Sequence, residues 1–475
     1  MIEIFKNIHY LSFKPLLTDM LLYLLIVMLL FFFFSIRRNA TLLEPWKKVI
    51  QRPLNMIVIL LLSSFAFITV LDSVHVEIAA NHPMASQYPN TFGTGQTKSI
   101  LDFWLKDAIE HQETSYSAPF ALFGFTKESM VKDGQVVRGY PRLTYAGQHL
   151  KNSSDKAMDI FKKISLAIIA ALFLLLALTV MRKTYKHIRE KFKKNQTREL
   201  TLNFPIKSYY LTLYLIFFIG FFITFNIGSY HILGTSKIGQ DVLYEAIKSI
   251  RTGVLIGTLT TLVMLPFAIF LGILAGYVRG WIDDLIQYIY TTLSSIPGIL
   301  LIAASVLSLQ VLMSAHQDWF DSMAERSDAR LLALCMILGV TSWTGLCRLL
   351  RGEALKLREI DYVLAARSLG VSHFKIMLKH LLPNMSHIIL ISIALDFSGL
   401  VLAEAVLSYI GVGVDPSAYS WGSMINSARL EMSRVPIVWW SLTAAFFFMF
   451  TLVLSANIFA DSLRDAFDPR LRDQK

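Results

Sequence analysis

Long apolar segments separated by polar ones dominate the hydrophobic pattern of this chain. The nine longest are rich in Leu, Ile and Phe, and they cover residues 20–36, 54–71, 164–181, 209–227, 254–278, 285–313, 331–346, 388–410 and 437–459. A helix needs about 20 apolar residues to cross roughly 30 Å of hydrocarbon, whereas sheet strands are much shorter. The pattern therefore predicts an all-α polytopic membrane protein with about nine transmembrane helices.

The composition agrees with that prediction, since 54% of the 475 residues are hydrophobic. The net charge of +11 could suggest nucleic acid as a partner, but the cationic residues gather in short loops. Nine Lys and Arg lie between Arg182 and Lys207. Basic residues concentrate in cytoplasmic loops and favour anionic lipid headgroups. The charge is thus interpreted as a topology signal at a lipid bilayer, with no role in binding nucleic acid.

Placing residues 182–207 in the cytoplasm fixes the side of every other segment. Residues 37–52, 348–387 and the C-terminal tail are then cytoplasmic, and the first 15 residues lie outside. Residues 72–163 form an outer insert without cysteine. We expect this insert to be a small extracytoplasmic domain or a cap packed on the spans or on a partner, because so small a core is marginal alone.

Two regions follow from this alternation of spans. Residues 1–200 hold three spans and the insert, and residues 205–475 hold six spans. The two cysteines, Cys335 and Cys347, fall in the seventh span. Their spacing places them about 18 Å apart along a helix, too far for a disulfide. We interpret both as packing residues.

A polar segment, YVLAARSLGVSHFKIMLKHLLPN at residues 362–384, interrupts the apolar C-terminal region. Apolar positions at helical spacing predict one helix over residues 358–369, ended by Gly370, which accepts the left-handed conformation. A second helix over residues 372–381 is expected to end before Pro383. The small side chains of Ala365 and Ala366 would let a partner approach the backbone. Such a rigid projection could move the attached spans when a partner pushes on it.

This segment resembles the EAA loop of ABC importer permeases, in which EAA is followed by three residues, Gly, nine residues, I, any residue and LP. Leu364, Ala365, Ala366, Gly370, His380 and Leu382-Pro383 occupy those places, and Leu364 and His380 depart from the pattern. The resemblance implies that the loop docks on a partner ATPase. The coupling residues it implies are Tyr362, Ala365, Ala366, Arg367, Gly370, Leu382 and Pro383.

Other segments are similar to the C-type permease subunit of the dipeptide/oligopeptide(/nickel) family. They are HILGTSKIGQD at 231–241, AGY at 275–277, GWID at 280–283, SIP at 295–297, LAEAVLSYIGVG at 402–413, SWG at 420–422 and DSLRDAFDPRLR at 461–472. The family usually has Arg and Asp where Tyr288 and Thr291 stand here. The likeness covers about residues 205–475, and the N-terminal 200 residues have no counterpart in the usual six-span subunit.

The resemblance implies a type I importer permease core and a bacterial inner-membrane location. It also implies a second permease as heterodimer partner, two ATP-binding subunits that use the ATP, and an extracytoplasmic substrate-binding protein. The expected substrates are dipeptides and oligopeptides, or alternatively nickel or another small solute. Pro297, Glu404 and Trp421 are candidates for the translocation path or gate. Residues 421–432 predict an amphipathic outer helix that Trp421 could anchor in the membrane interface.

Two other functions remain open from the residues. Asp396 and Glu404 lie eight positions apart in one span, where acids are costly and usually functional or paired, so a proton-coupled secondary transporter is one alternative. A sensor fused to a permease remnant is another. The glycine-rich residues 93–99 lack the adjacent Gly-Lys of a nucleotide-binding loop, and no histidine pair has metal-ligand spacing. We therefore expect no enzymatic site and no bound cofactor.

Overall fold

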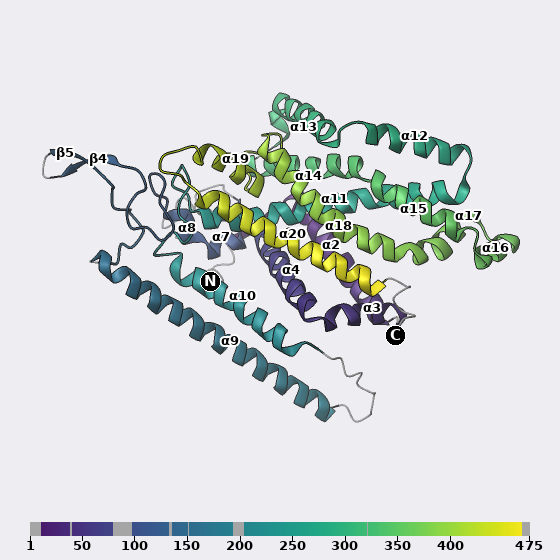
Figure 1. The fold of residues 1–475 in the computed structure, drawn as a ribbon, viewed down its shortest axis with the longest axis horizontal. Helices are drawn as coiled ribbons and strands as arrows, with labels where there is room; N and C mark the ends of the chain where they lie inside the picture. The colour runs from purple at the N-terminus through teal and green to yellow at the C-terminus, as the bar shows by residue number, and fades with distance from the viewer. Residues whose placement is uncertain are drawn as a thin grey trace. The chain divides into compact units, whose positions relative to one another are not determined.

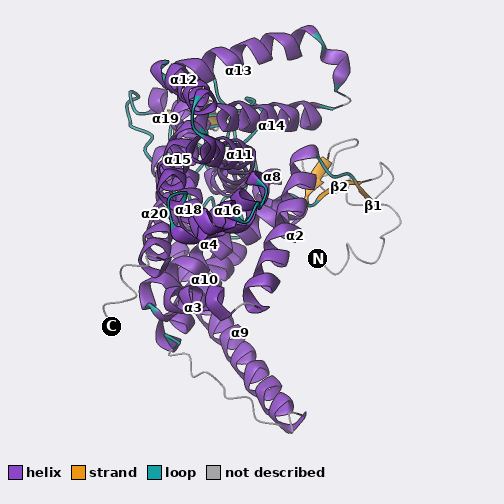
Figure 2. Cartoon of the chain, turned by 90° about the vertical axis from the view of Figure 1, so that its right-hand side faces the viewer, coloured by secondary structure: helices purple, strands orange, loops and turns teal. Residues whose placement is uncertain are grey.

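The computed structural model describes residues 11–38, 40–78, 97–132, 135–150, 152–192, 204–320 and 322–467, and helices dominate this part of the chain (Figures 1 and 2). The longer helices are α2 (Leu17–Arg38), α3 (Ala40–Gln51), α4 (Pro53–Asp72), α9 (Lys156–Phe192), α10 (Ile206–Asn226), α11 (Val242–Val278), α12 (Trp281–Ser295), α13 (Gly298–Ala315), α14 (Met323–Ser342), α15 (Thr344–Leu357), α18 (Leu382–Tyr409), α19 (Trp421–Glu431) and α20 (Trp440–Phe467). Among the described residues, nine helical segments are long and apolar enough to cross a membrane, one at each predicted stretch. The prediction of nine spans is confirmed.

The sixth predicted span is not one continuous helix. It was expected over residues 285–313, but α12 ends at Ser295 and α13 begins at Gly298. Ile296 between them is extended, with φ −84° and ψ 132°. Pro297 explains the break, because proline lacks the N–H that helix propagation needs and pushes the preceding residue out of the helical region.

Two compact units make up the chain. The first comprises Met1–Lys14, Lys47–Lys248 and Ser427–Phe448, and the second comprises Pro15–Trp46, Ser249–Asn426 and Met449–Lys475. This division does not follow the sequence boundary near residue 200. Within the first unit, α10 packs against α9 and α4, as Figure 1 shows for α9 and α10. Within the second unit, α2 of the N-terminal region packs against α14. Spatial packing thus joins helices from both sequence regions.

Among the described residues of the first unit, two small sheets occur that the apolar pattern did not predict (Figure 2 shows β1 and β2). The strands β1 (Leu11–Phe13), β2 (His75–Ile78) and β3 (Thr97–Ser99) form an antiparallel sheet, and β4 (Glu128–Lys132) pairs with β5 (Gln135–Gly139). Since β1 pairs with β2 of the insert, residues 11–13 lie on the same side of the membrane as the insert. Two short helices, α7 (Ile100–Trp104) and α8 (Lys106–Glu110), follow β3.

The insert packs on the spans of its own unit, as one of the predicted alternatives proposed. Leu122 and Leu150 form a small buried cluster with Tyr230 from the loop after α10. The Trp104 indole N–H donates to the Thr224 hydroxyl of α10 at 3.1 Å. Ser99, from the glycine-rich segment discussed above, caps α7, and the glycines of that segment lie outside the described residues.

Two apolar cores are found among the described residues of the second unit. One joins α11, α12, α15 and α18 around the buried Leu350, and the other joins α2, α11, α13, α14 and α18 around the buried Leu334. Cys335 and Cys347 are buried free thiols, which confirms their interpretation as packing residues. A Cβ at Gly276 would lie 2.6 Å from the Cβ of Ala354, so glycine lets α11 and α15 approach closely.

A buried ionic cluster fastens α2 to the same unit. The Arg251 guanidinium donates to Asp19 of α2 at 2.7 Å and lies 3.4 Å from Asp328 of α14. The backbone N–H of Thr18 donates to Asp328 at 2.9 Å, and the Thr18 hydroxyl donates to the same carboxylate. A buried carboxylate without its cation is strongly destabilising. The first N-terminal helix is therefore an integral part of the second unit.

Candidate functional site

The loop at residues 348–387, predicted to be cytoplasmic, forms a chain of short helices between two spans. After α15, the helix α16 (Asp361–Ser368) is followed by α17 (His373–Ile376) and a single π-helical turn, η4 (Met377–Leu381), which continues directly into α18. The expectation that the second helix ends before Pro383 is wrong. Pro383 lies in the first turn of α18, where a missing N–H removes no required hydrogen bond, and the π turn accommodates the change in register.

The predicted stop of the first helix at Gly370 is confirmed. Gly370 has φ +74°, and its N–H donates to the Arg367 carbonyl at 3.0 Å. The Val371 N–H donates to the Ala366 carbonyl at 3.1 Å. These two bonds are those of a Schellman motif, which satisfies the last helix carbonyls and turns the chain sharply. The left-handed glycine thus fixes the direction of α17 relative to α16.

Four polar contacts hold this loop on the ends of neighbouring helices. The Tyr277 hydroxyl lies 2.9 Å from His373 Nδ1, and Arg358 donates to the Tyr277 carbonyl at 2.8 Å. Asn384 donates to the Tyr362 hydroxyl at 2.9 Å. Nearby, the Arg351 guanidinium of α15 donates two hydrogen bonds, of 2.6 and 2.8 Å, to the Asp283 carboxylate of α12.

The Arg351 guanidinium also lowers the pKa of the Asp283 carboxyl. The hydrogen bonds from Arg351 outweigh the opposing effect of burial, so the carboxyl stays charged and the pair stays formed. A movement of the loop would therefore be transmitted to α11, α12 and α15.

The exposed surface of the loop includes most of the predicted coupling residues. Tyr362, Ala365, Arg367, Gly370 and Pro383 are exposed, and Leu382 is partly buried. The expectation that Ala366 also meets a partner is wrong, since only 8% of it is exposed.

Helical geometry gives the reason for that correction. Val363 and Ala366 are three positions apart, so both face the apolar core of the second unit. Ala366 is thus a packing residue under α16, and Ala365 is the small residue on its outer surface.

Large apolar side chains complete what we call the coupling surface: the exposed Tyr362, Leu364, Leu369, Phe374 and Leu378 on α16, α17 and the segments joined to them. Leu369 is 84% exposed and Phe374 is 60% exposed. In the sequence-based topology this surface lies in the cytoplasm, beyond the lipid. A gathered set of exposed apolar residues in water marks a protein contact.

The three candidates for the path or gate lie on three different parts of the fold. Pro297 is exposed at the break between α12 and α13. Glu404 is buried in α18, where it accepts a hydrogen bond from the Ser408 hydroxyl at 2.6 Å. Trp421 begins α19 and is only 1% exposed, because its ring packs against Gly253 of α11. The interpretation of Trp421 as an anchor in the membrane interface is therefore wrong.

The geometry of α18 gives no proton path between its two acids. Asp396 and Glu404 are eight residues apart, which is about 12 Å along a helix and too far for direct transfer. Among the described residues, Asp396 makes no side-chain hydrogen bond, and Glu404 accepts one from the Ser408 hydroxyl on its own helix. The arrangement is that of an isolated acid and a locally paired one.

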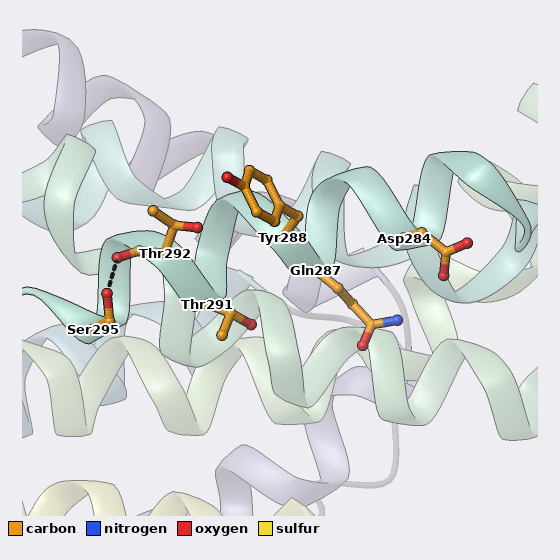
Figure 3. Close-up of a pocket in the computed structure, with 6 residues that line it drawn as sticks. All are labelled: Asp284, Gln287, Tyr288, Thr291, Thr292 and Ser295. Carbon is orange, nitrogen blue, oxygen red and sulfur yellow. Dashed lines mark hydrogen bonds between the residues drawn. The ribbon is translucent and has the colours of Figure 1, made fainter.

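A polar groove along α12 was missed by the sequence analysis. Asp284, Gln287, Tyr288, Thr291, Thr292 and Ser295 line an open depression of about 520 Å³, and Figure 3 shows their side chains on successive turns of the helix. Their spacing of three and four residues was a readable signal of one helix face. The opposite face packs through the buried Asp283, Ile286 and Tyr290.

A second missed cluster lies in the first unit, where the insert meets the loop after α10. The buried His231 lies 2.9 Å from Asp241 and 3.6 Å from Glu113 of the insert. Glu113 also accepts the backbone N–H groups of Thr144 and Tyr145, each at 2.9 Å. A Cβ at Gly239 would lie only 1.7 Å from the Glu113 carbonyl oxygen, so this contact requires glycine.

Burial and hydrogen bonding oppose each other in the pKa values of this cluster. Burial alone would lower the pKa of His231, but the hydrogen bond to Asp241 and the nearby negative charge of Glu113 outweigh it and raise that pKa to about 9. Burial would raise the pKa of Glu113, but the nearby His231 imidazolium and hydrogen bonds from backbone N–H groups lower it to about 2. The imidazole is thus charged at neutral pH and joins the insert to the loop through opposite charges.

These features define a polytopic membrane protein in which a cytoplasmic helical loop is rigidly joined to the transmembrane helices, as in a transport permease. Residues 268–473 match the family model described as "Binding-protein-dependent transport system inner membrane component". The chain belongs to this family of ABC importer permeases, and it is a multi-pass protein of the bacterial inner membrane.

Curated relatives agree with the family match. The chain is 31% identical over 245 residues to the oligopeptide transport system permease protein OppC of Mycobacterium bovis, covering 52% of this chain and 78% of the relative. It is 31% identical over 244 residues to the glutathione transport system permease protein GsiD of Pectobacterium atrosepticum, covering 51% and 74%.

The dipeptide transport system permease protein DppC of Lactococcus lactis is 31% identical over 240 residues. That alignment covers 50% of this chain and 64% of the relative, less than two thirds of its length. The outer insert lies outside the residues that the family model matches.

Proposed function

We propose that this chain is a membrane-spanning permease subunit of an ATP-driven importer and forms, with a second permease, the translocation path for peptides. The coupling surface carries the proposal. Its exposed apolar side chains stand on a Schellman turn that is tied by hydrogen bonds to the ends of the spans. A partner that binds there can move those spans as a unit, which is the requirement for alternating access.

The proposed partners are a second permease, two ATP-binding subunits and an extracytoplasmic substrate-binding protein. The family description itself names a binding-protein-dependent system. In this proposal the ATP-binding subunits dock on the coupling surface, with Tyr362, Ala365 and Arg367 in contact, and they carry out all ATP hydrolysis. The chain itself has no catalytic role.

The proposed substrates are di- and oligopeptides. The relatives are named for dipeptide, oligopeptide and glutathione transport, and all three substrates contain amide-linked amino acids. These names favour peptides over nickel as the solute of this chain.

The test is affinity purification of the tagged chain from its native membrane, followed by uptake of radiolabelled tri-alanine in proteoliposomes. We expect ATP-binding subunits to co-purify, and Ala365→Glu to abolish their retention by placing a charge on the docking face. Ala157→Glu is the matched control, since Ala157 is exposed in the first turn of α9, far along the chain from the coupling surface.

Two results would contradict the proposal. One is purification of the intact chain without any ATP-binding subunit. The other is uptake that continues without ATP and stops when a protonophore collapses the proton gradient, which would favour the proton-coupled carrier.

A further inference from the structure

One face of α12 is polar and exposed although the helix belongs to a membrane-crossing segment. The stripe of Gln287, Tyr288, Thr291 and Ser295 repeats at three- and four-residue intervals, with Thr292 beside it. Next to it, Leu285 and Ile289 form an exposed apolar strip on the same helix. At 100° per residue, Ile289 is about 160° away from Thr291 around the helix. The helix thus has an exposed apolar strip that borders the polar stripe on one side.

In the sequence-based topology, the break at the end of α12 falls inside the sixth predicted span, next to the polar stripe. α12 has 15 residues, so it rises about 22 Å and cannot cross a hydrocarbon core of roughly 30 Å. Residues 294–300 are all exposed on this chain. The Ser295 hydroxyl donates to the Thr292 carbonyl, one of the last carbonyls of α12, at 2.7 Å.

Contact with lipid hydrocarbon would destabilise the non-helical backbone between α12 and α13. Non-helical backbone at membrane depth is tolerated where it is buried in protein or lines a water-filled cavity, because unpaired peptide groups have no partner in hydrocarbon. The groove also has only one wall, since all six residues that line it come from α12. Among the described residues, no other element contributes to an opposite wall.

We infer that the polar stripe of α12, with the break at Ser295–Pro297, is one wall of the substrate path and that the second permease supplies the other wall. This inference rests on the proposed function and adds the side chains that meet the substrate. Hydroxyl and amide groups from Gln287, Tyr288, Thr291 and Ser295 can exchange hydrogen bonds with the backbone of a peptide. Asp284, at the start of the stripe, is its only carboxylate.

The chemistry of this wall sets a class of substrate. Between Gln287 and Ser295 the lining side chains are uncharged and both donate and accept hydrogen bonds. Such a wall suits peptides through their main chain and discriminates little between uncharged side chains. Charged side chains would find no complementary charge along this stretch. The path is therefore selective for peptides with neutral side chains.

The location of the stripe is tested by cysteine labelling of the purified complex in proteoliposomes. Thr291→Cys and Ser295→Cys are compared with Ile289→Cys as the matched control on the apolar face, and wild type gives the background from its two buried thiols. A water-soluble maleimide should label Thr291→Cys and Ser295→Cys about tenfold faster than Ile289→Cys, because lipid surroundings raise the thiol pKa by about one unit. Equal rates at Thr291 and Ile289 would show that the stripe faces lipid and would overturn the inference.

The substrate class is tested with Thr291→Asp, which adds one negative charge to the wall at an exposed position. The ratio of tri-lysine uptake to tri-alanine uptake should rise about fivefold through Coulomb attraction at close range. The same substitution at the control site, Ile289→Asp, should not raise this ratio. An unchanged ratio in a Thr291→Asp transporter that still imports tri-alanine would refute the role of the stripe. Labelling needs no ATP, so its failure is distinguishable from failure of the proposed function.

Discussion

Two glycines in identical backbone settings allow the coupling role of the loop to be separated from its stability. Gly370 after α16 has φ +74°, and Gly411 after α18 has φ +81°. Both end a helix in a Schellman motif: the Gly411 N–H donates to the Ser408 carbonyl at 3.0 Å, and the Val412 N–H donates to the Leu407 carbonyl at 2.9 Å. A Cβ added at either glycine would meet nothing within 4 Å. The two positions therefore differ in location and not in local strain.

Alanine at either position should be destabilising by about 1 kcal/mol, the penalty of the left-handed conformation for a residue with a Cβ. For units of this size that corresponds to a fall of about 2–4 °C in the thermal midpoint. At Gly370 the same conformational penalty also favours loop conformations in which α17 takes another direction relative to α16, so that the coupling surface is not formed. A penalty of about 1 kcal/mol would reduce the competent population about fivefold.

The assay combines thermal unfolding of the purified complex with ATP-driven tri-alanine uptake in proteoliposomes. We expect Gly370→Ala and Gly411→Ala to lower the midpoint equally, and only Gly370→Ala to reduce uptake, by up to about fivefold. Gly370→Asn should restore most of the uptake, because asparagine tolerates the left-handed region. Equal losses of uptake in both alanine variants would show that Gly370 acts through general stability, and the reasoning about coupling would be refuted.

Three other predictions concern the polar contacts. Arg351→Met should lower the free energy of unfolding, measured by denaturant titration, by about 2 kcal/mol. This is less than for a fully buried pair because Arg351 is partly exposed. Adding Asp283→Asn should recover part of the loss, because it removes the unpaired carboxylate. The folded pKa of His231, about 9, exceeds its ordinary value of 6.5, so the stabilisation that protonated His231 provides is complete below pH 6.5 and is lost as pH rises through 9. Limited proteolysis of the insert should therefore become faster over that pH range. The variant His231→Gln should abolish this pH dependence. Asp19→Asn should lower the thermal midpoint by several degrees because Arg251 loses a buried partner, whereas an unchanged midpoint would show that α2 is dispensable for the fold.

The sequence predicted the helices where one physical constraint acts on a long stretch of chain. Each apolar stretch must satisfy its own backbone hydrogen bonds in lipid, so length and composition alone reveal the spans. The end of α16 at Gly370 was also predictable from the local sequence, because the left-handed turn there favours a residue without a Cβ. Proline was less predictable. Pro297 lies between α12 and α13 after an extended residue, whereas Pro383 follows a π-helical turn that keeps the chain helical, so the effect depends on the backbone that precedes the proline.

The sequence by itself determined that this chain crosses a membrane many times, that its cytoplasmic loop carries the pattern of an importer permease, and that its charge marks topology. Only the tertiary structure decided which residues share a surface. It moved Ala366 and Trp421 from exposed roles into packed ones, and it brought Asp19 to Arg251 and Glu113 to His231 across long separations in sequence. The physical reason is the range of the interactions. Hydrophobic length and backbone conformation are local properties, whereas burial and charge pairing depend on which helices the whole chain brings together.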